Sequence, residues 1–505
     1  MAFPASVHDF IVVGGGSAGC VLATRLSEDE NVRVLLLEAG AGQPLEASAV
    51  PPAWPTLLGS SMDWCTSTVE LAATGSPMPW PRGRGLGGSS ALNGMVFTRG
   101  HYSSYDAWSE AGAKGWGFAD LLPYFRRTEN VEGRDPALRG VGGPLTVRPA
   151  EPNPAVRALL DAAAEAGHPV ATDISGGREE GFGLPDLNIV DGERQSAADA
   201  YLRPALRRPN LDVVTDAPVH RVLVEGGRCT GVEYRVGTEV VTAACTREVV
   251  LTAGVVGSAQ LLLLSGIGPQ AHLREVGVDV TLDLPGVGAN MHDHPMTTVV
   301  YTSRQPMAAS ANNHGEAIGL VRSGPDTDGP DLQILFVAMP YYDVMTLPGP
   351  QEGYTIAVSL MNPRSRGTVR LATADPAAAP LLDPAYLTDE RDLQLMALGL
   401  RMAREIGDAP ALDPWRDAEA LPGLDVFGAD RVQDYVRRSL LPYFHGVGTC
   451  RIGSDDAAVV DSDLRVHGID GLRVADASVM PSIVSANTNA TVYAIAERAA
   501  VLLTG

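Results

Sequence analysis

The stretch that most constrains the fold of this chain runs from Phe10 to Glu38, where glycines spaced G-x-G-x-x-G follow a short apolar run. Residues 10–13 are all apolar, which is typical of a buried parallel strand. A helix is predicted over residues 18–27, and a second apolar run over 32–37 ends at Glu38. A strand, a glycine turn, a helix and a second strand in this order predict the βαβ unit of a nucleotide-binding fold.

The glycines and Glu38 each have a physical role in such a unit. Gly14 permits a tight turn, Gly16 leaves room for a pyrophosphate at the backbone, and Gly19 lets helix and strand pack closely. The helix N-terminus offers free N–H groups to the phosphates. Glu38 lies 19 residues after Gly19, where a carboxylate accepts from ribose hydroxyls and disfavours NADP. This unit does not separate FAD from NAD, and a glycine turn without a ligand is the plain alternative.

Length, charge and cysteines limit the class of protein. A chain of 505 residues is too long for one core, so we expect two lobes. The net charge of −22 repels nucleic acid and anionic membranes, so neither is expected as a partner. Five scattered cysteines, an odd number, favour reduced thiols in the cytoplasm. We expect no signal peptide before Phe10, and no apolar run reaches the roughly eighteen residues of a membrane helix.

A second glycine-rich segment, residues 82–95, reads Arg-Gly-Arg-Gly-Leu-Gly-Gly-Ser-Ser-Ala-Leu-Asn-Gly-Met. So many glycines and hydroxyls favour a backbone that lies against a flat or anionic ligand. A surface turn is the alternative, but the segment continues into the apolar residues 95–97, which favours burial. The stretch before it, residues 40–81, is rich in proline and irregular, and we expect it to include a lid at about 45–80.

The rest of the chain predicts two kinds of sheet. An antiparallel meander is expected over 211–215, 219–224, 231–234 and 239–243, followed by a second strand, glycine turn and helix over 247–264. A separate antiparallel sheet is expected from 299–302, 332–337, 354–360 and 367–371. A helix is expected over 389–406, a last strand over 472–476 and a last helix over 487–503.

Five ordered motifs resemble those of the glucose–methanol–choline (GMC) oxidoreductases, a family of flavoenzymes. Residues 83–97 resemble the first family signature, and residues 254–268 resemble the second, with Ala259 where the family usually has proline. The loop 285–295, which ends in Asp293-His-Pro295, resembles a further family segment. Residues 445–449 and 476–489 resemble the C-terminal catalytic segments. The resemblance covers nearly the whole chain and is nearest to the choline oxidase and hydroxymethylfurfural oxidase branch.

The resemblance implies an α/β fold, with a Rossmann-like FAD-binding lobe and a substrate lobe built on an antiparallel sheet flanked by helices. The FAD-binding lobe would comprise 1–155, 206–296 and 441–505, and the substrate lobe 156–205 and 297–440. The implied FAD-binding residues are Gly14, Gly16, Ser17, Ala18, Gly19, Glu38, Ala39, Arg84, Gly87, Gly88, Ser89, Asn93, Gly94, Met95, Val96, Val219, Ala253, Asp476, Ala477, Asn487 and Thr488.

The resemblance also bears on how FAD would be held. Choline oxidases carry a flavin-linking histidine just before the asparagine of the first signature. This chain has Leu92 at that position, and residues 82–100 contain neither histidine nor cysteine. We therefore predict that FAD is bound without a covalent link.

Alcohol oxidation needs a base for the hydroxyl proton and an acceptor for the hydride, which would be flavin N5. Histidine suits the base because its reference pKa is about 6.5. The resemblance places His445 in this role and Asn489 as a second hydrogen-bond partner of the same substrate oxygen. We expect Phe336, Tyr443 and Phe444 to line the substrate pocket. His292 and His294 are interpreted as loop residues, and no metal site is predicted.

The start of the last helix supports an electrostatic role. Asn487-Thr-Asn489 is favourable N-cap chemistry. A helix N-terminus aimed at flavin N1 and C2=O would stabilise the negative charge that develops there on reduction. An ordinary capped helix is the alternative.

We therefore expect FAD-dependent oxidation of an alcohol, primary or aryl, to an aldehyde, with O2 as the electron acceptor and a monomer or homodimer as the enzyme. A dehydrogenase that passes electrons to a quinone or another acceptor is one alternative, because oxygen reactivity depends on small features beside flavin C4a. A non-redox enzyme like the hydroxynitrile lyases is a second, because those enzymes share the family fold.

Overall fold

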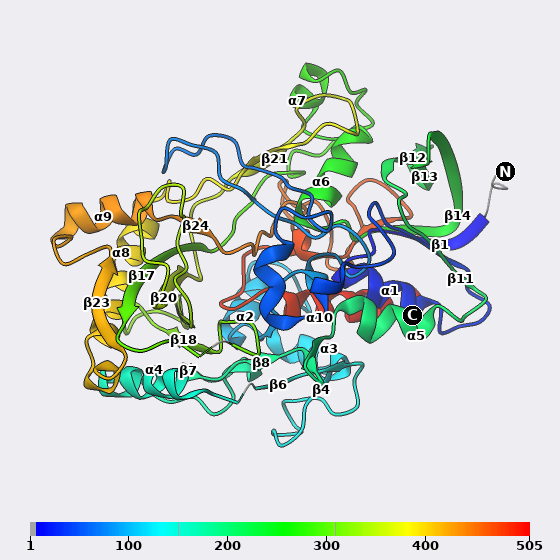
Figure 1. Ribbon diagram of the computed structural model, residues 1–505. Coiled ribbons are helices and arrows are strands. Elements are labelled where there is room, and N and C mark those ends of the chain that lie inside the picture. The colour runs from blue at the N-terminus through cyan, green and yellow to red at the C-terminus, as the bar shows by residue number, and fades with distance from the viewer. Residues whose placement is uncertain (1–6, 150, 309) are drawn as a thin grey trace.

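The computed structural model describes residues 7–149, 151–308 and 310–505. Two large sheets lie at opposite ends of the molecule, and helices and irregular segments fill the space between them (Figure 1). The first sheet has strands from both the N-terminal and the C-terminal part of the chain, and the second has strands from the middle. The predicted arrangement of two lobes, one α/β and one built on an antiparallel sheet, is confirmed.

The nucleotide-type sheet has seven strands. Its parallel part comprises β11 (Leu211–Val214), β2 (Val34–Leu37), β1 (Val7–Val13), the end of β14 (Glu239–Leu251) and β25 (Leu472–Val474). The antiparallel part is formed by β12 (Val219–Glu225), β13 (Arg228–Val236) and the beginning of β14. The four residues of β2 and the last four of β1 are buried, as their apolar composition predicts.

Strand β14 is one strand, whereas the sequence predicts two, at 239–243 and from 247 onward. It is continuous over thirteen residues, and it changes partner rather than direction. Up to Ala244 it pairs antiparallel with β13, and from Ala244 onward it pairs parallel with β1. Residues 244–247 contain neither glycine nor proline, so the chain stays extended between the two pairings.

Helices pack the parallel part of this sheet. α1 (Ser17–Leu26) follows β1 directly and contacts α10 (Asn489–Thr504), which in turn contacts α3 (Phe118–Thr128). Residues 490–497 of α10 are all buried, because the helix runs through the centre of the molecule (Figure 1). α6 (Gly254–Leu264) follows β14, which confirms the predicted second strand, glycine turn and helix. The two βα units bring their glycine turns to the same edge of the sheet.

The second sheet is antiparallel, in the order β23 (Arg416–Leu421), β17 (Pro295–Ser303), β20 (Tyr354–Leu360), β19 (Leu332–Val337), β18 (Ala317–Val321) and β7 (Gly181–Gly183), with β24 (Leu441–Pro442) beside β17. α8 (Glu390–Gly407) covers one face, together with α4 (Pro154–Glu165) and α9 (Ala429–Arg438). Asp389 caps α8 by accepting from the N–H of Arg391, which agrees with the predicted start.

The predicted strand at 367–371 does not join this sheet. It is β21 (Thr368–Arg370), which pairs only with β22 (Leu381–Asp383). The Val369 N–H donates to the carbonyl of Gly288 at 2.7 Å, so the loop at 285–290 takes the position of a neighbouring strand. The lobe boundaries given above remain a prediction.

Shorter elements complete the fold. They are α2 (Tyr102–Glu110), α5 (Arg203–Ala205), α7 (Gln270–Glu275), β3 (Val96–Phe97), β4 (Glu129–Asn130), β5 (Leu145–Thr146), β6 (Arg148–Pro149), β8 (Asp186–Leu187), β9 (Ile189–Val190), β10 (Glu193–Arg194), β15 (Ile267–Gly268) and β16 (Leu282–Asp283). Across the described residues, no helix combines the length and apolarity needed to cross a membrane.

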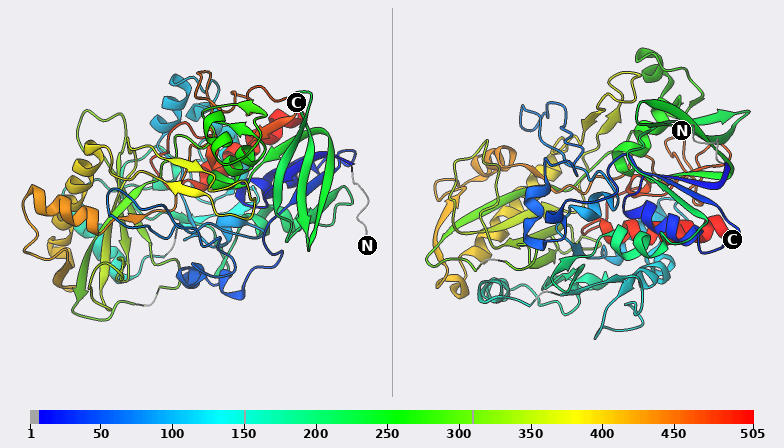
Figure 2. Two further views of the ribbon diagram at one scale, coloured as in Figure 1. Left: turned by 90° about the horizontal axis from the view of Figure 1, so that it is seen from above. Right: turned by 45° about the vertical axis from the view of Figure 1, so that its right-hand side comes forward.

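The segment 40–81 contains only short helical turns, Glu46–Ser48 and Pro51–Leu57, and isolated bridges. Figure 2 shows it, in blue, running between the two sheets. It contacts the second lobe through Trp54, whose indole N–H donates to the Asn313 carbonyl at 2.9 Å. His314 Nε2 lies 3.0 Å from the Pro52 carbonyl. A lid function for this segment remains a prediction.

Candidate active site

The first glycine turn has the geometry that its sequence predicts. Gly14 has a φ of +105°, and a Cβ there would lie 2.7 Å from the Thr252 carbonyl oxygen. A Cβ on Gly19 would lie 1.8 Å from the Gly14 carbonyl, so helix and strand could not pack as they do. A Cβ on Gly16 would meet a single heavy atom of the described chain within 4 Å, the Cα of Gly88 at 3.9 Å. The turn thus leaves open space beside Gly16.

Two helix N-termini meet at this space. Ser17, the first residue of α1, donates its hydroxyl to Asn489 Oδ1 at 2.9 Å, and Asn489 is the first residue of α10. Neither helix has a side-chain cap from any residue that the structure describes. The predicted capping by Asn487-Thr-Asn489 is therefore wrong, because the Asn489 side chain is used by Ser17. Uncapped N–H groups and two positive dipole ends suit an anionic ligand such as a pyrophosphate.

Glu38 connects the glycine turn to the second glycine-rich segment. Its carboxylate accepts from the backbone N–H groups of Gly15 at 2.7 Å, Gly40 at 2.8 Å and Gly85 at 2.9 Å. Burial raises the pKa of this carboxyl, and the three N–H groups oppose that effect. The predicted role of Glu38 at the ribose side of a nucleotide remains a prediction. The same carboxylate also holds three backbone segments together.

The segment 82–97 lies against the first glycine turn. Gly88 begins a short helical turn, and a Cβ on Gly88 would lie 2.7 Å from the Gly16 Cα, so the two glycine turns are in contact. Asn93 Oδ1 accepts from the Met95 N–H at 3.0 Å and from Arg194 Nη1 at 2.8 Å. These bonds hold Met95, which is buried, at a φ of +59°. Around Gly94, a Cβ would find its nearest neighbours only at 4.0 Å, which leaves room for a flat ring.

His445 lies just after β24, and its backbone N–H donates to Asp293 Oδ1 at 2.7 Å. Its Nε2 lies 3.1 Å from Asn487 Nδ2, and its Nδ1 lies 2.9 Å from His294 Nδ1. The Tyr443 ring lies beside it, with ring centroids 4.2 Å apart. Burial lowers the pKa of His445 well below its usual value, and His294 and Arg82 lower it further. A neutral imidazole at pH 7 can accept a proton, as a general base must.

Asp293 holds the backbone of His445 in place. Its Oδ1 also accepts from the His294 N–H at 2.8 Å, and its Oδ2 accepts from the Tyr386 hydroxyl at 2.6 Å. Burial raises the pKa of this carboxyl, while Tyr386 and Arg82 lower it. Arg82 reaches the same region and donates to the Phe444 carbonyl. The Asp293-His-Pro295 loop and the 82–97 segment thus position the His445 backbone.

The structure corrects the predicted partner of His445. The amide beside its Nε2 belongs to Asn487, whereas Asn489 faces Ser17. Asn487 precedes α10, so its side chain is free to turn toward His445, and Asn489 is already part of the first helical turn. Asn487 Oδ1 is buried and has no hydrogen-bond partner within the described chain. An open acceptor there suits a substrate hydroxyl or a cofactor N–H.

His294 is the residue that sequence reasoning missed. It lies in a loop, as the sequence predicts, but it is fully buried and its ring lies against His445, with ring centroids 5.2 Å apart and planes at 88°. The signal for it was its place in the Asp293-His-Pro295 motif. His292 has a structural role, because its Nε2 accepts from the Ile483 N–H at 2.9 Å and its Nδ1 lies 2.6 Å from the Asn290 carbonyl.

Phe336 does not line the pocket, so this prediction is wrong. Side chains alternate along β19, and Gln333 faces the pocket side, because it accepts from the Tyr443 hydroxyl at 2.7 Å. Phe336 is on the opposite face, in the core with α8, and it stacks on Phe182 at 5.7 Å. Its cross-strand neighbours Ala317 and Ile356 belong to the same core. A continuous apolar strand conceals which face each residue takes.

Several predicted cofactor residues are used within the protein. Asp476 Oδ2 accepts from the Gly254 N–H at 2.8 Å and from the Ser258 hydroxyl at 2.6 Å, which anchors the start of α6. Arg84 is exposed, and its guanidinium lies 5.2 Å from the centroid of the Trp64 ring. Contacts of Ala39, Ser89, Val96, Val219, Ala253, Ala477 and Thr488 with a cofactor remain predictions.

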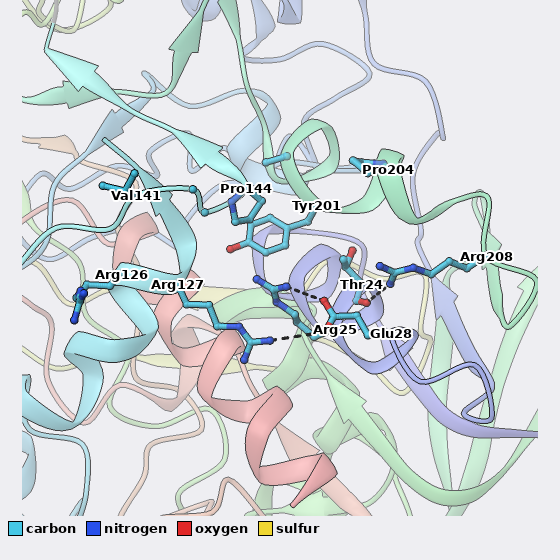
Figure 3. Close-up of a pocket in the computed structure, with 13 residues that line it drawn as sticks. Thr24, Arg25, Glu28, Arg126, Arg127, Val141, Pro144, Tyr201, Pro204 and Arg208 are labelled. Carbon is cyan, nitrogen blue, oxygen red and sulfur yellow. Dashed lines mark hydrogen bonds and ion pairs between the residues drawn. The ribbon is translucent and has the colours of Figure 1, made fainter. Parts of the chain in front are cut away.

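A separate cavity of about 510 Å³ lies between α1 and α3. Figure 3 shows Arg25 and Arg127 pointing toward Glu28 at its floor. No group of three or more His, Cys, Asp or Glu side chains that could hold a metal occurs in residues 7–149, 151–308 or 310–505.

Comparisons with known proteins agree with this geometry. Residues 8–296 and 363–496 match family models described as GMC oxidoreductase. The mitochondrial choline dehydrogenase of Homo sapiens is 40% identical over 99% of this chain and 90% of its own length. The oxygen-dependent choline dehydrogenase of Brucella canis is 38% identical over 97% of this chain and 94% of its own length. The crystal structure of pyridoxine 4-oxidase from Mesorbium loti has a TM-score of 0.95 at 36% identity and covers 98% of both chains.

Proposed function

The chain belongs to the GMC oxidoreductase family, and on that premise we propose that it is an FAD-dependent enzyme that oxidises a primary or aryl alcohol to an aldehyde with O2 as acceptor. The observation that carries the proposal is the position of the His445 imidazole, whose Nε2 lies 3.1 Å from the Asn487 amide nitrogen, and burial lowers its pKa. His445 is the base, and Asn487 holds the substrate oxygen.

The residues around the two glycine turns fit FAD. Gly14, Gly16 and the N-terminus of α1 would hold its pyrophosphate, Glu38 its ribose, and residues 93–96 would border its flavin ring. We propose that FAD is bound without a covalent link, because residues 82–100 have no histidine or cysteine to attach it. Acid precipitation should release all flavin into the supernatant. Flavin that stays with the pellet would contradict this proposal.

The positions of the side chains around His445 indicate what each of them would do in the reaction. When bound, FAD supplies the two-electron acceptor for the hydride. In the free site Asn487 Nδ2 lies 3.1 Å from His445 Nε2. With substrate bound, Asn487 would donate to the substrate oxygen instead, and His445 Nε2 would then remove the hydroxyl proton. Asp293 keeps the imidazole in place through the backbone N–H of His445. The uncapped N-terminus of α10 would stabilise the negative charge that develops on reduction if the flavin ring lies in front of it.

The pocket favours an uncharged substrate. Tyr443, Phe444 and Met95 give it apolar and aromatic surface. The carboxylate nearest His445, Asp293, is already used by two backbone N–H groups and the Tyr386 hydroxyl, so it is not available to pair with a substrate cation. A neutral aryl carbinol, the class that includes pyridoxine, therefore fits better than a cation that needs a carboxylate partner, whereas a quaternary ammonium such as choline could still bind the aromatic rings through cation–π contacts.

Anaerobic mixing with a panel of alcohols tests the proposal. Choline, pyridoxine, benzyl alcohol and aliphatic primary alcohols would each be mixed with the yellow holoprotein, and flavin absorbance followed. Loss of absorbance with an aryl carbinol is expected, and it would exclude the lyase alternative. If no alcohol reduces the flavin, the proposal is wrong.

Turnover in air separates oxidase from dehydrogenase. We expect one H2O2 for each aldehyde formed. Aldehyde that appears only with a quinone or dye would favour the dehydrogenase, the alternative that the name of the human relative suggests. A cytoplasmic location and a monomeric or homodimeric state remain predictions from the composition.

A further inference from the structure

His294 and His445 face each other through the same ring nitrogen. The two Nδ1 atoms are 2.9 Å apart, and the His294 side chain is fully buried. Two unprotonated nitrogens would repel each other at this distance, so one of them carries a proton and donates it to the other. Which one donates decides whether the Nε2 of His445 is free to act as a base.

The neighbours of the pair decide the direction. On the pocket side, Asn487 presents its Nδ2, which can only donate, to His445 Nε2 at 3.1 Å. His445 Nε2 is therefore the acceptor, and the proton of the neutral ring is on Nδ1. On the buried side, His294 Nε2 has no hydrogen-bond partner within the described chain, and the backbone groups that raise the pKa of this ring are those of Met361 and Val484. Because His445 Nδ1 carries its proton, His294 Nδ1 is the acceptor, and the proton of the neutral His294 ring is on Nε2.

We propose that His294 is a positioning residue that fixes His445 in the Nδ1–H tautomer and so leaves Nε2 unprotonated toward the substrate. All hydrogen bonds then run in one direction, from Asn487 to His445 Nε2 and from His445 Nδ1 to His294 Nδ1. The inference rests on the proposed role of His445 as base. It adds a residue that does not touch the substrate but determines the state of one that does.

The backbone holds the pair rigidly enough for this role. Asp293 Oδ1 accepts from the N–H of His294 at 2.8 Å and from the N–H of His445 at 2.7 Å, so one carboxylate oxygen ties both residues together. The other ionisable groups around the pair include His292, Arg82, Tyr386 and Tyr443.

The pair also accommodates the proton that catalysis delivers. When Nε2 of His445 takes the hydroxyl proton, the ring becomes a cation that still donates from Nδ1 to neutral His294, and this hydrogen bond becomes charge-assisted. Burial lowers the pKa of His294 to about 3, so His294 stays neutral and does not compete for the proton. The proton leaves by the reverse path, from Nε2, after the product departs.

Nitrogen NMR of the holoprotein tests the tautomer directly. With 15N-labelled histidine, two-bond correlations distinguish a protonated from an unprotonated ring nitrogen, and the His445→Ala variant identifies the signals of that ring. We expect His445 to carry its proton on Nδ1 in the parent. A proton on Nε2 of His445 in the parent would overturn the proposal, whatever the variants do.

Two variants of His294 separate positioning from packing. His294→Leu fills similar space without an acceptor, whereas an amide oxygen in His294→Asn can replace Nδ1. In hydrolases, loss of the correct histidine tautomer costs up to about 10⁴, and for the neutral partner here we expect a loss of roughly 10 to 10² in the flavin reduction rate of His294→Leu. We expect His294→Asn to recover most of it and to restore the Nδ1–H signal. His467→Asn, on a histidine that contacts the Gly453 carbonyl instead, is the control.

The outcomes distinguish this inference from the proposed function. If His294→Leu keeps the Nδ1–H tautomer, or if both variants lose the same rate, His294 acts only through packing and the inference is wrong. If the parent shows the Nδ1–H tautomer but no alcohol reduces the flavin, the proposed function fails and the tautomer assignment stands.

Discussion

Two polar regions of the molecule use their charges in opposite ways. At the cavity between α1 and α3, Arg25 pairs with Glu28 at 2.7 Å (Figure 3). Beneath it, Arg25 also pairs with the buried Glu497 at 2.8 Å, and Arg127 reaches Glu497 at 3.2 Å. Tyr201 donates to Glu497 as well, at 3.0 Å. At His445, by contrast, one base faces an amide whose oxygen has no partner in the described chain, beside two helix ends without side-chain caps.

The difference shows which property identifies a ligand-binding site in this fold. The arginine cavity has volume and charge, but Arg25 and Arg127 are already paired with Glu28 and Glu497, and these pairs stabilise the packing of α1 against α10 and α3. The region at His445 leaves hydrogen-bonding capacity unused, which costs stability unless a ligand supplies the missing partners. The predictions below test this contrast.

Removing the base should have the largest effect. We expect His445→Ala to lower the flavin reduction rate by roughly 10² to 10⁴, because general-base catalysis contributes about this much. The variant should keep its FAD, since His445 does not hold the nucleotide. Anaerobic stopped-flow absorbance measures the rate, and a variant reduced at the parental rate would remove His445 from this role.

Glu497→Gln should affect stability and leave the chemistry unchanged. Breaking a buried ion pair leaves an uncompensated charge, so we expect the free energy of unfolding to fall by about 3–5 kcal/mol. Glu28→Gln, in the same cavity but partly exposed, is the matched control and should cost at most about 1 kcal/mol. Denaturant unfolding measures both. A reduction rate per bound flavin that falls in Glu497→Gln would contradict the structural role of this cavity.

Substitutions of Asn487 and Asn489 should affect different properties of the protein. We expect Asn487→Ala to slow flavin reduction by roughly 10- to 10²-fold, a smaller loss than removal of the base itself. Asn489→Ala should instead weaken FAD retention, because it loses the hydrogen bond that joins the first turns of α1 and α10. Rate per bound flavin and flavin content are measured on the same samples. The opposite pattern would restore Asn489 as the partner of His445.

Acid should destabilise the protein through its buried histidines. Burial lowers the pKa of His292 and His294, so below about pH 6.5 the unfolded chain takes up protons that the folded chain refuses. Each of these histidines contributes fully to the free energy of unfolding above pH 6.5. Its contribution decreases as the pH falls, by about 1 kcal/mol between pH 7.0 and 5.5. His294→Asn should lose that much less than the parent over this range in urea unfolding.

Patterns between residues near one another in sequence predict much of the fold and of the first glycine turn. The apolar runs, the glycine spacing and Glu38 predict β1, α1 and β2 because strand, turn and carboxylate depend on neighbours in sequence. Phe336 could not be placed, because β19 is apolar on both faces and its register depends on β18 and β20. Asn487 and Asn489 differ by two positions at a helix start, and only the observed first residue of α10 separates them. The contact between His294 and His445 spans 151 residues of sequence, beyond the reach of local patterns.

A crystal structure of the protein purified with its flavin tests the central claim most directly. We predict a flavin ring bordered by residues 93–96, its pyrophosphate beside Gly16 at the N-terminus of α1, and His445 Nε2 facing the ring from the substrate side together with Asn487. A flavin bound elsewhere, or a ring from which His445 is turned away, would contradict the account.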